Sequence, residues 1–222
     1  MAAGVRKQYL MLGGRPILSL TIQAIAAASG IGEIFLVVPE TDFDYCLQTV
    51  IAPLDSPKPI HLVAGGASRQ VSVFNGLCAV SARDGVALIH DGVRPFVATR
   101  HINACIKAAE NGDACSLGVP ARDTVKQVSD SNYVRCTLDR QTLWMAQTPQ
   151  AFELSYFRQA HAYAAETAYS GTDDAAIIEH YGGSVKMIEG SPWNIKITTP
   201  EDMQLAAWIW ESGVAYAGAQ SG

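Results

Sequence analysis

The sequence predicts an α/β fold with a doubly wound, mainly parallel sheet. Two observations favour this class: short apolar runs alternate with longer helical patterns, and polar or glycine-rich loops follow several of the apolar runs. Strands that alternate with helices at this spacing form βαβ crossovers, which connect parallel strands. Because ligands bind beyond the carboxyl ends of such strands, the loops that follow the strands are the candidate functional positions.

Apolar runs predict the strands in the first half of the chain at 33–38, 60–64, 86–90 and 114–119. Helical patterns separate them at 39–52, 71–80 and 101–111. Further along, 154–167 and 173–181 are expected helices, and 185–189 is an expected strand. The last helix, from Pro200 to about Ser212, has clear start signals, because Thr199 can cap it and Pro200 fits its first turn.

The region between Thr124 and Leu138 interrupts this alternation. Its segments VKQV and YVRCTL flank SDSN, a pattern typical of a β-hairpin. We therefore expect a protruding hairpin arm over about residues 121–142, and such arms often form dimer contacts. Because the chain shows no internal repeat or low-complexity linker, residues 1–222 are expected to form a single domain that carries this arm.

Composition excludes several classes of protein. Hydrophobic residues make up 49% of the 222 residues, enough to build a sizeable core. No apolar run reaches the ~18 residues of a membrane span and no signal-peptide core follows Lys7, so a cytoplasmic protein without a membrane partner is expected. The net charge of -5, without a basic run, argues against nucleic-acid binding. Five cysteines without a C-x-x-C pair make a disulfide framework or zinc site unexpected.

Two post-strand loops carry residues suited to phosphate chemistry. Gly65 and Gly66 let a backbone approach a ligand closely beside a helix N-terminus, although a plain tight turn explains the pair equally well. Asp91 follows the strand that ends at residue 90, with Arg94 three residues further on. A carboxylate in this position can hold Mg²⁺ near phosphates, and the competing interpretation is a cap for the next turn.

Two further segments contain groups that suit an anionic ligand. Thr124 and Arg140 bracket the hairpin and Thr148 follows it; hydroxyl and guanidinium groups recognise phosphate monoesters, but these could also be ordinary turn residues. Lys196 lies in a strand-like segment before the last helix. A lysine in such a position favours an anionic partner.

Taken together, several motifs resemble those of the 2-C-methyl-D-erythritol 4-phosphate cytidylyltransferase family: KQYLMLGGRPIL, GGASRQVSV, HDGVRPF, ARDTVK, LDRQTLWMAQTPQAF, TDDAA and NIKITTPED. The resemblance implies a Rossmann-like nucleotidyltransferase fold. It also implies Mg²⁺-dependent transfer of CMP from CTP to methylerythritol phosphate, with release of pyrophosphate. Ribitol-5-phosphate cytidylyltransferase shares most of these motifs and is the alternative, although the segment from Thr137 to Trp144 resembles the erythritol enzyme more.

The resemblance also implies a role for each candidate residue. Lys7 and Lys196 would stabilise the α-phosphate, and Asp91 would hold Mg²⁺ or the ribose side of CTP. The nucleotide pocket would be lined by Gly65, Gly66, Ser72 and Gly92. The sugar phosphate would meet Thr148, together with Thr124 and Arg140 from the arm of a homodimeric partner, and Arg94 and Thr172 would support that pocket.

The sequence departs from the family pattern at its start. Met1 stands where the final methionine of a glycine-rich motif, xxAAGxGxRM, is expected from its distance to Lys7. The strand and phosphate-cradling loop of that pattern would then precede Met1. Five buried apolar side chains of such a strand are worth ~7–15 kcal/mol, comparable with the stability of a whole domain. We expect either that Met1 is not the native start or that another strand repairs the sheet; an inactive chain that only dimerises or binds nucleotide is a further alternative.

Overall fold

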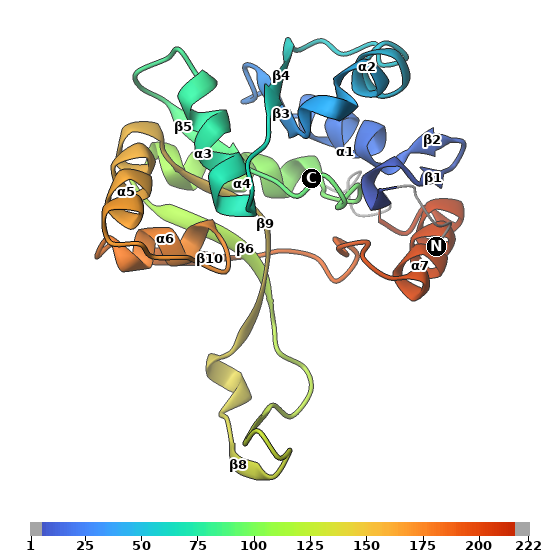
Figure 1. Ribbon diagram of the computed structural model, residues 1–222. Helices are drawn as coiled ribbons and strands as arrows, with labels where there is room; N and C mark the ends of the chain where they lie inside the picture. Colours follow the sequence, from blue (N-terminus) through green and yellow to red (C-terminus); the bar gives the residue numbers. More distant parts are fainter. Residues whose placement is uncertain (1–5, 216–222) are drawn as a thin grey trace.

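The computed structural model describes residues 6–215, so the expectation about Met1 lies outside the described residues. The chain forms a body of strands and helices from which one hairpin projects (Figure 1). The first half of the body comprises η1 (Lys7–Tyr9), β1 (Met11–Leu12), β2 (Arg15–Pro16), α1 (Ile17–Ala26), β3 (Ile34–Val38), η2 (Glu40–Asp42), α2 (Phe43–Tyr45), η3 (Cys46–Ile51), β4 (Ile60–Ala64), α3 (Arg69–Ala79) and β5 (Val86–Ile89).

The second half contains both the arm and the remaining body elements. It comprises α4 (Thr99–Glu110), β6 (Ala114–Pro120), β7 (Lys126–Val128), β8 (Val134–Thr137), η4 (Arg140–Thr142), β9 (Trp144–Glu153), α5 (Leu154–Glu166), α6 (Asp174–His180), β10 (Val185–Glu189) and α7 (Pro200–Ser212). The expected strands and helices listed above lie within two residues of their predicted bounds, except that 39–52 forms the three short elements η2, α2 and η3 in place of one helix.

The strands confirm the α/β class. β3 pairs in parallel with β4, and a separate four-stranded sheet has the order β10-β6-β9-β5. β10 and β6 are parallel, while β9 runs antiparallel to both of its neighbours. The residue pattern does not predict β9, because polar side chains interrupt its apolar run at Gln147, Thr148 and Gln150.

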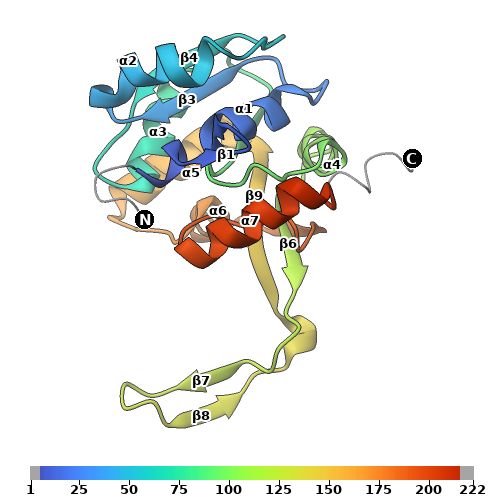
Figure 2. The ribbon, with the colours of Figure 1, turned by 90° about the vertical axis from the view of Figure 1, so that its right-hand side faces the viewer.

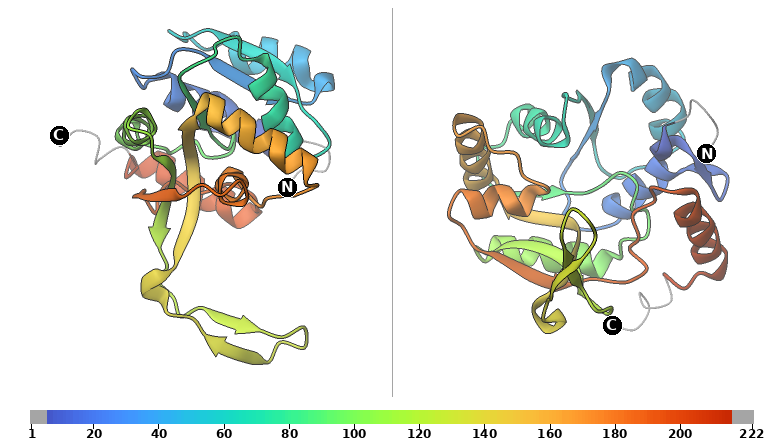
Figure 3. Two further views of the ribbon diagram at one scale, coloured as in Figure 1. Left: turned by 90° about the vertical axis from the view of Figure 1, so that its left-hand side faces the viewer. Right: turned by 60° about the horizontal axis from the view of Figure 1, so that its bottom comes forward.

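Helices cover both faces of the four-stranded sheet, and the views in Figures 2 and 3 show β9 between α4 and α5. On the α4 side, Ile102 and Ile106 pack with Leu117 of β6 and with Ile25 of α1. On the α5 side, Phe157 packs with Phe152 of β9 and with residues of α3 and α6. Because both faces of the sheet are covered, most body strands have short, continuous apolar sequences.

The hairpin arm is formed by β7 and β8, which pair antiparallel with Lys126 opposite Thr137. Figures 1 and 2 show it projecting away from the body on the extended ends of β6 and β9. All residues of both arm strands are exposed. The arm therefore makes few packing contacts within its own chain.

The final helix positions the segment that contains Lys196. Thr199 accepts a hydrogen bond from the Asp202 amide, the Asp202 carboxylate accepts one from the Thr199 amide in return, and Pro200 occupies the first turn, so the predicted cap is confirmed. Lys196 itself does not lie in a strand, contrary to expectation; its segment is an extended loop, tied to the body by a bond from the Ile197 amide to the Val93 carbonyl. Within residues 6–215, no helix combines the length and apolar character needed to cross a bilayer.

Removing the cap of α7 should weaken the fold modestly. Thr199→Ala leaves the Asp202 amide without its acceptor, and we expect a loss of about 0.5–2 kcal/mol in the free energy of unfolding. Urea titration followed by circular dichroism measures this loss. Thr199→Ser is the matched control and should retain nearly full stability; equal losses in both variants would contradict the assigned cap.

Candidate active site

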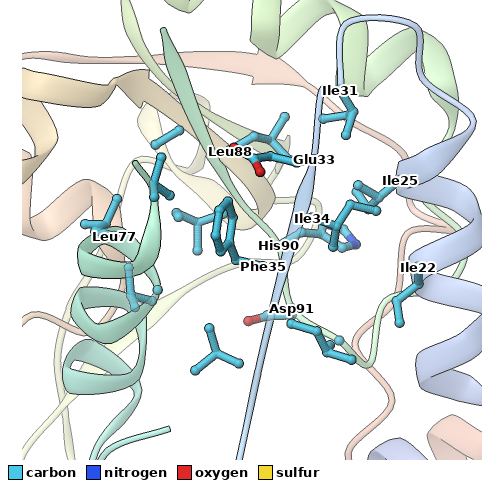
Figure 4. Close-up of a pocket in the computed structure, with 18 of the residues that line it drawn as sticks. Ile22, Ile25, Ile31, Glu33, Ile34, Phe35, Leu77, Leu88, His90 and Asp91 are labelled. Atoms are coloured by element: carbon cyan, nitrogen blue, oxygen red, sulfur yellow. The ribbon is translucent and has the colours of Figure 1, made fainter. Parts of the chain in front are cut away.

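Loops from four parts of the chain converge at the carboxyl end of β5. Asp91 lies at their centre, two residues after the strand ends, with its side chain 13% exposed. Figure 4 shows Asp91 and His90 beside the cavity that runs along β3 and β5. Lys7, from η1, lines the same cavity as Asp91 and Lys196. The structure thus pairs Lys196 with the candidate metal-binding carboxylate and places Lys7 along the same cavity.

Three cationic side chains surround the Asp91 carboxylate. Lys196 Nζ lies 3.1 Å from Oδ2, Arg94 Nε lies 3.4 Å from the same oxygen, and Arg69 Nε lies 3.5 Å from Oδ1. Burial alone would raise the pKa of Asp91, but the charges of Lys196 and Arg69 outweigh it and lower the pKa below its ordinary value. Asp91 is therefore a carboxylate at neutral pH.

A chain of hydrogen bonds fixes the loop that carries Asp91. The Asp91 amide donates to Thr148 Oγ1 over 3.0 Å, and Thr148 Oγ1 lies 3.1 Å from His90 Nδ1. His90 Nε2 lies 3.0 Å from the Arg94 carbonyl, which can only accept, so Nε2 carries the proton and Nδ1 accepts from Thr148. Burial lowers the pKa of His90 to about 4, and the neutral ring that this chain requires is the stable form at pH 7.

Arg69 connects Asp91 to the start of α6. Its guanidinium lies 2.6 Å from the Asp174 carboxylate, and that side chain is only 1% exposed. Gln150 of β9 holds this helix start, because its side-chain oxygen accepts from the Asp174 amide and its nitrogen donates to the Asp173 carboxylate. β9 thereby positions Arg69, which is not among the site residues predicted from the sequence.

Arg94 is anchored from the other side of the site. It is buried and donates to the Asn194 carbonyl over 2.7 Å, while the Asn194 side chain donates from Nδ2 to the Thr148 carbonyl over 2.9 Å. These bonds tie the Lys196 segment to β9 and to the loop after β5. Arg94 therefore holds the site together as well as contributing charge.

Two of the candidate glycines, at the same end of the strands, pack too closely against neighbouring side chains to carry a Cβ. A Cβ on Gly66 would collide with Val71, and a Cβ on Gly92 would lie 2.8 Å from Leu18. Ser72 accepts a hydrogen bond from the Gly66 amide over 3.0 Å. Gly65, Gly66 and Ser72 thus form the tight connection between β4 and α3, as the sequence suggests, on the side of the site where Arg69 begins α3.

The remaining candidates lie apart from Asp91. Thr124 and Arg140 belong to the exposed arm, where Arg140 donates to the Arg122 carbonyl over 2.8 Å. Figure 1 shows that the arm points away from the body, and among the described residues no hydrogen bond or ion pair joins Thr124 or Arg140 to the Asp91 cluster. Thr172 is exposed and directly precedes Asp173, which caps α6.

Four residues of this network were not among the candidates chosen from the sequence: Arg69, Gln150, Asp174 and Asn194. Each falls within one of the motifs GGASRQVSV, LDRQTLWMAQTPQAF, TDDAA and NIKITTPED. Their order along the chain gives no indication that they meet, because the contacts depend on β9 running antiparallel beside β5. Among the described residues no three His, Cys, Asp or Glu side chains cluster as metal ligands.

A carboxylate held among cations, in loops at the carboxyl ends of strands, is an arrangement suited to an α/β enzyme that acts on phosphate-bearing ligands. Comparison with known sequences then gives the family. The model of the 2-C-methyl-D-erythritol 4-phosphate cytidylyltransferase family matches residues 1–212. The chain belongs to this family.

Individual relatives agree with the family match. The 2-C-methyl-D-erythritol 4-phosphate cytidylyltransferase of Syntrophotalea carbinolica is 51% identical over 93% of this chain and 88% of its own length. That of Geobacter metallireducens is 44% identical over 93% and 90%. The crystal structure of 4-diphosphocytidyl-2C-methyl-D-erythritol synthase from Anaerococcus prevotii is 32% identical, covers 95% of this chain and 92% of its own, and has a TM-score of 0.85.

The neutral state of His90 makes stability depend on pH. Its pKa is about 4 in the folded chain and ~6.5 when unfolded, so the stabilisation is complete above pH 6.5 and is lost as the pH falls towards 4. His90→Gln can still donate to the Arg94 carbonyl. As the pH falls over this interval, we expect its free energy of unfolding to decrease by about 1–3 kcal/mol less than that of the wild-type chain. Urea titrations at pH 7.5 and 4.5 measure the difference, and an unchanged pH slope would contradict the assignment.

Proposed function

We propose that the Asp91 cluster binds the triphosphate of CTP and catalyses transfer of its cytidylyl group to 2-C-methyl-D-erythritol 4-phosphate. An oxygen of the sugar phosphate attacks the α-phosphorus, a new P–O–P linkage forms, and the bond to the β-phosphate breaks. The products are 4-diphosphocytidyl-2-C-methyl-D-erythritol and pyrophosphate. Family membership supports the reaction, and the group of cations around one carboxylate supports its location.

The charge arrangement suits the needs of this reaction. Two anionic phosphates must approach each other, and charge accumulates on the α-phosphate oxygens in the transition state. Lys7 and Lys196 border the same cavity and would place positive charge there. Arg69, held by buried Asp174, adds a further cation. Gly65, Gly66, Ser72 and Gly92 would line the nucleoside pocket.

We further propose that Asp91 holds Mg²⁺ together with the substrate phosphates. Mg²⁺ commonly binds one or two carboxylates and completes its shell with phosphate oxygens and water, so a single buried carboxylate fits this ion. The lowered pKa of Asp91 keeps it deprotonated for this role. The ion would supply additional neutralisation of phosphate charge when bound.

The sugar-phosphate pocket is proposed to be completed by a partner subunit. Thr148 lies at the site, whereas Thr124 and Arg140 lie on the arm. The arm also carries apolar side chains that have little cover in their own chain, with Tyr133 78% and Val134 58% exposed. Because exposed apolar groups of this kind mark interfaces, we propose a homodimer in which each arm reaches towards the other body. Arg94 and Thr172 would support the completed pocket.

The choice between sugar phosphates is settled by a direct assay. CTP is offered with either 2-C-methyl-D-erythritol 4-phosphate or ribitol 5-phosphate, and pyrophosphate release is measured. Faster turnover of methylerythritol phosphate is the expected result. Preference for ribitol phosphate would support the sister activity, and dimer formation without any pyrophosphate release would support a chain that has lost catalysis.

Removing either candidate lysine should impair the chemical step more than nucleotide binding. In Lys196→Ala and Lys7→Ala we expect kcat to fall about 10²–10³-fold while the Kd for CTP changes less than about tenfold, because each charge acts mainly on the transition state. Steady-state assays and calorimetry measure the two quantities. Lys186→Ala, which removes the exposed ion pair between Lys186 of β10 and Asp113, is the control and should keep full turnover. Wild-type turnover in either site variant would show that its role is misassigned.

Subunit exchange tests whether Arg140 acts across the dimer. Arg140→Ala and Lys196→Ala chains are each expected to be poorly active, but a hybrid dimer has one site with both lesions and one with neither. A one-to-one mixture should therefore recover about a quarter of wild-type activity. If labelled subunits are shown to exchange and activity does not return, Arg140 does not complete the partner's site.

A further inference from the structure

A side-chain amide on α3 holds the loop that joins α5 to α6. Gln70 is the second residue of α3 and is partly buried. Its Nε2 donates to the Tyr169 carbonyl over 3.1 Å, and its Oε1 accepts from the Gly171 amide over 3.1 Å. Because one amide group supplies both a donor and an acceptor, Gln70 fixes the loop backbone on either side of Ser170.

The other end of the same loop is held separately, by β9. Gln150 Oε1 accepts from the Asp174 amide over 3.0 Å, and Gln150 Nε2 donates to the Asp173 carboxylate over 2.8 Å. The two glutamines therefore anchor Gly171 on one side of Thr172 and Asp173 on the other. The backbone around Thr172 is thus fixed from two different elements of the fold.

The side chain of Thr172 is available to a ligand, although its backbone is held. Thr172 is exposed, and within residues 6–215 no hydrogen bond engages its hydroxyl. Two residues further along, the Asp174 carboxylate lies 2.6 Å from the guanidinium of Arg69, and Arg69 Nε lies 3.5 Å from Asp91. A hydroxyl can donate to a phosphate oxygen. The loop therefore offers one such donor beside the residues that connect it to Asp91.

The loop between β4 and α3 is held by hydrogen bonds in which Gln70 takes no part. Ser68 Oγ accepts from the Val71 amide over 3.2 Å, and Ser72 Oγ donates to the Ser68 carbonyl over 2.8 Å. Ser72 Oγ also accepts from the Gly66 amide. A substitution that removes only the amide group of Gln70 therefore leaves this loop, and the nucleotide pocket assigned to it, with all of these bonds.

We propose that Gln70 is a positioning residue for the sugar phosphate. It acts through the loop, because its donor and its acceptor are both bonded to loop backbone, and it holds Thr172 where the hydroxyl can donate to a phosphate oxygen. Without these bonds the loop must be ordered when the ligand binds, and this ordering weakens affinity. The role rests on the proposed function, since the sugar phosphate is taken as the ligand that meets Thr172.

Gln70→Met tests this role, because it keeps the length of the side chain and removes both hydrogen bonds. We expect the Kd for 2-C-methyl-D-erythritol 4-phosphate to rise about five- to thirtyfold, the cost of ordering roughly one residue on binding. The Kd for CTP should change less than about twofold. Calorimetric titration measures both constants. The matched control is Gln159→Met on α5, where Gln159 accepts from the Tyr181 hydroxyl beyond the end of α6, and it should leave both constants unchanged.

A double variant tests whether Gln70 acts through Thr172. Thr172→Val removes the hydroxyl and keeps the shape, so adding Gln70→Met to it should raise the Kd for the sugar phosphate by less than about twofold. The positioning role is overturned if the two effects are fully additive, if Gln70→Met weakens CTP binding equally, or if it leaves the sugar-phosphate Kd unchanged.

Turnover separates this inference from the proposed function. A wild-type chain that binds the sugar phosphate but releases no pyrophosphate from CTP would refute the proposed function, while the predicted change of Kd in Gln70→Met would still support the positioning role. A chain that turns over normally and binds the sugar phosphate equally well with and without Gln70 would refute the positioning role alone. Absence of any sugar-phosphate binding by the wild-type chain would refute both.

Discussion

The geometry of the site depends on one buried carboxylate. Asp91 is charged because Lys196 and Arg69 lie within 3.5 Å of it, and each of these cations comes from a segment distant in sequence. Removing one member of this partly buried ion cluster leaves the others without compensation. The same attraction therefore holds the loops in place, with three cations gathered around the carboxylates of Asp91 and Asp174.

This cluster is supported by polar side chains of β9 that face the site. Thr148 orients His90 and the Asp91 amide, and Gln150 fixes the start of α6 and with it the Asp174 partner of Arg69. Because β9 runs antiparallel between β5 and β6, its middle passes directly beside the carboxyl end of β5. The strand then continues towards the arm, so the same element connects the site to the proposed dimer contact.

Much of this arrangement could be predicted from the sequence, and the exceptions have physical reasons. Strands such as β3 and β5 are short apolar runs between helices, and the cap at Thr199 is a local pattern, so both are visible without a structure. The sequence pattern does not predict β9, because Gln147, Thr148 and Gln150 form polar hydrogen bonds and interrupt its apolar run. The link from Arg69 to Asp174 spans 105 residues and depends on tertiary packing, which local periodicity does not encode.

In the proposed function, Asp91 joins the metal ion and the nucleotide phosphates in one site. Calorimetric titration of CTP into the wild-type chain and into Asp91→Asn, at low and at saturating Mg²⁺, tests it most directly. We expect wild-type affinity for CTP to increase with Mg²⁺, and Asp91→Asn to lose that dependence and bind at least about tenfold more weakly at saturating Mg²⁺. Unchanged affinity and unchanged Mg²⁺ dependence in a folded Asp91→Asn chain would contradict the account.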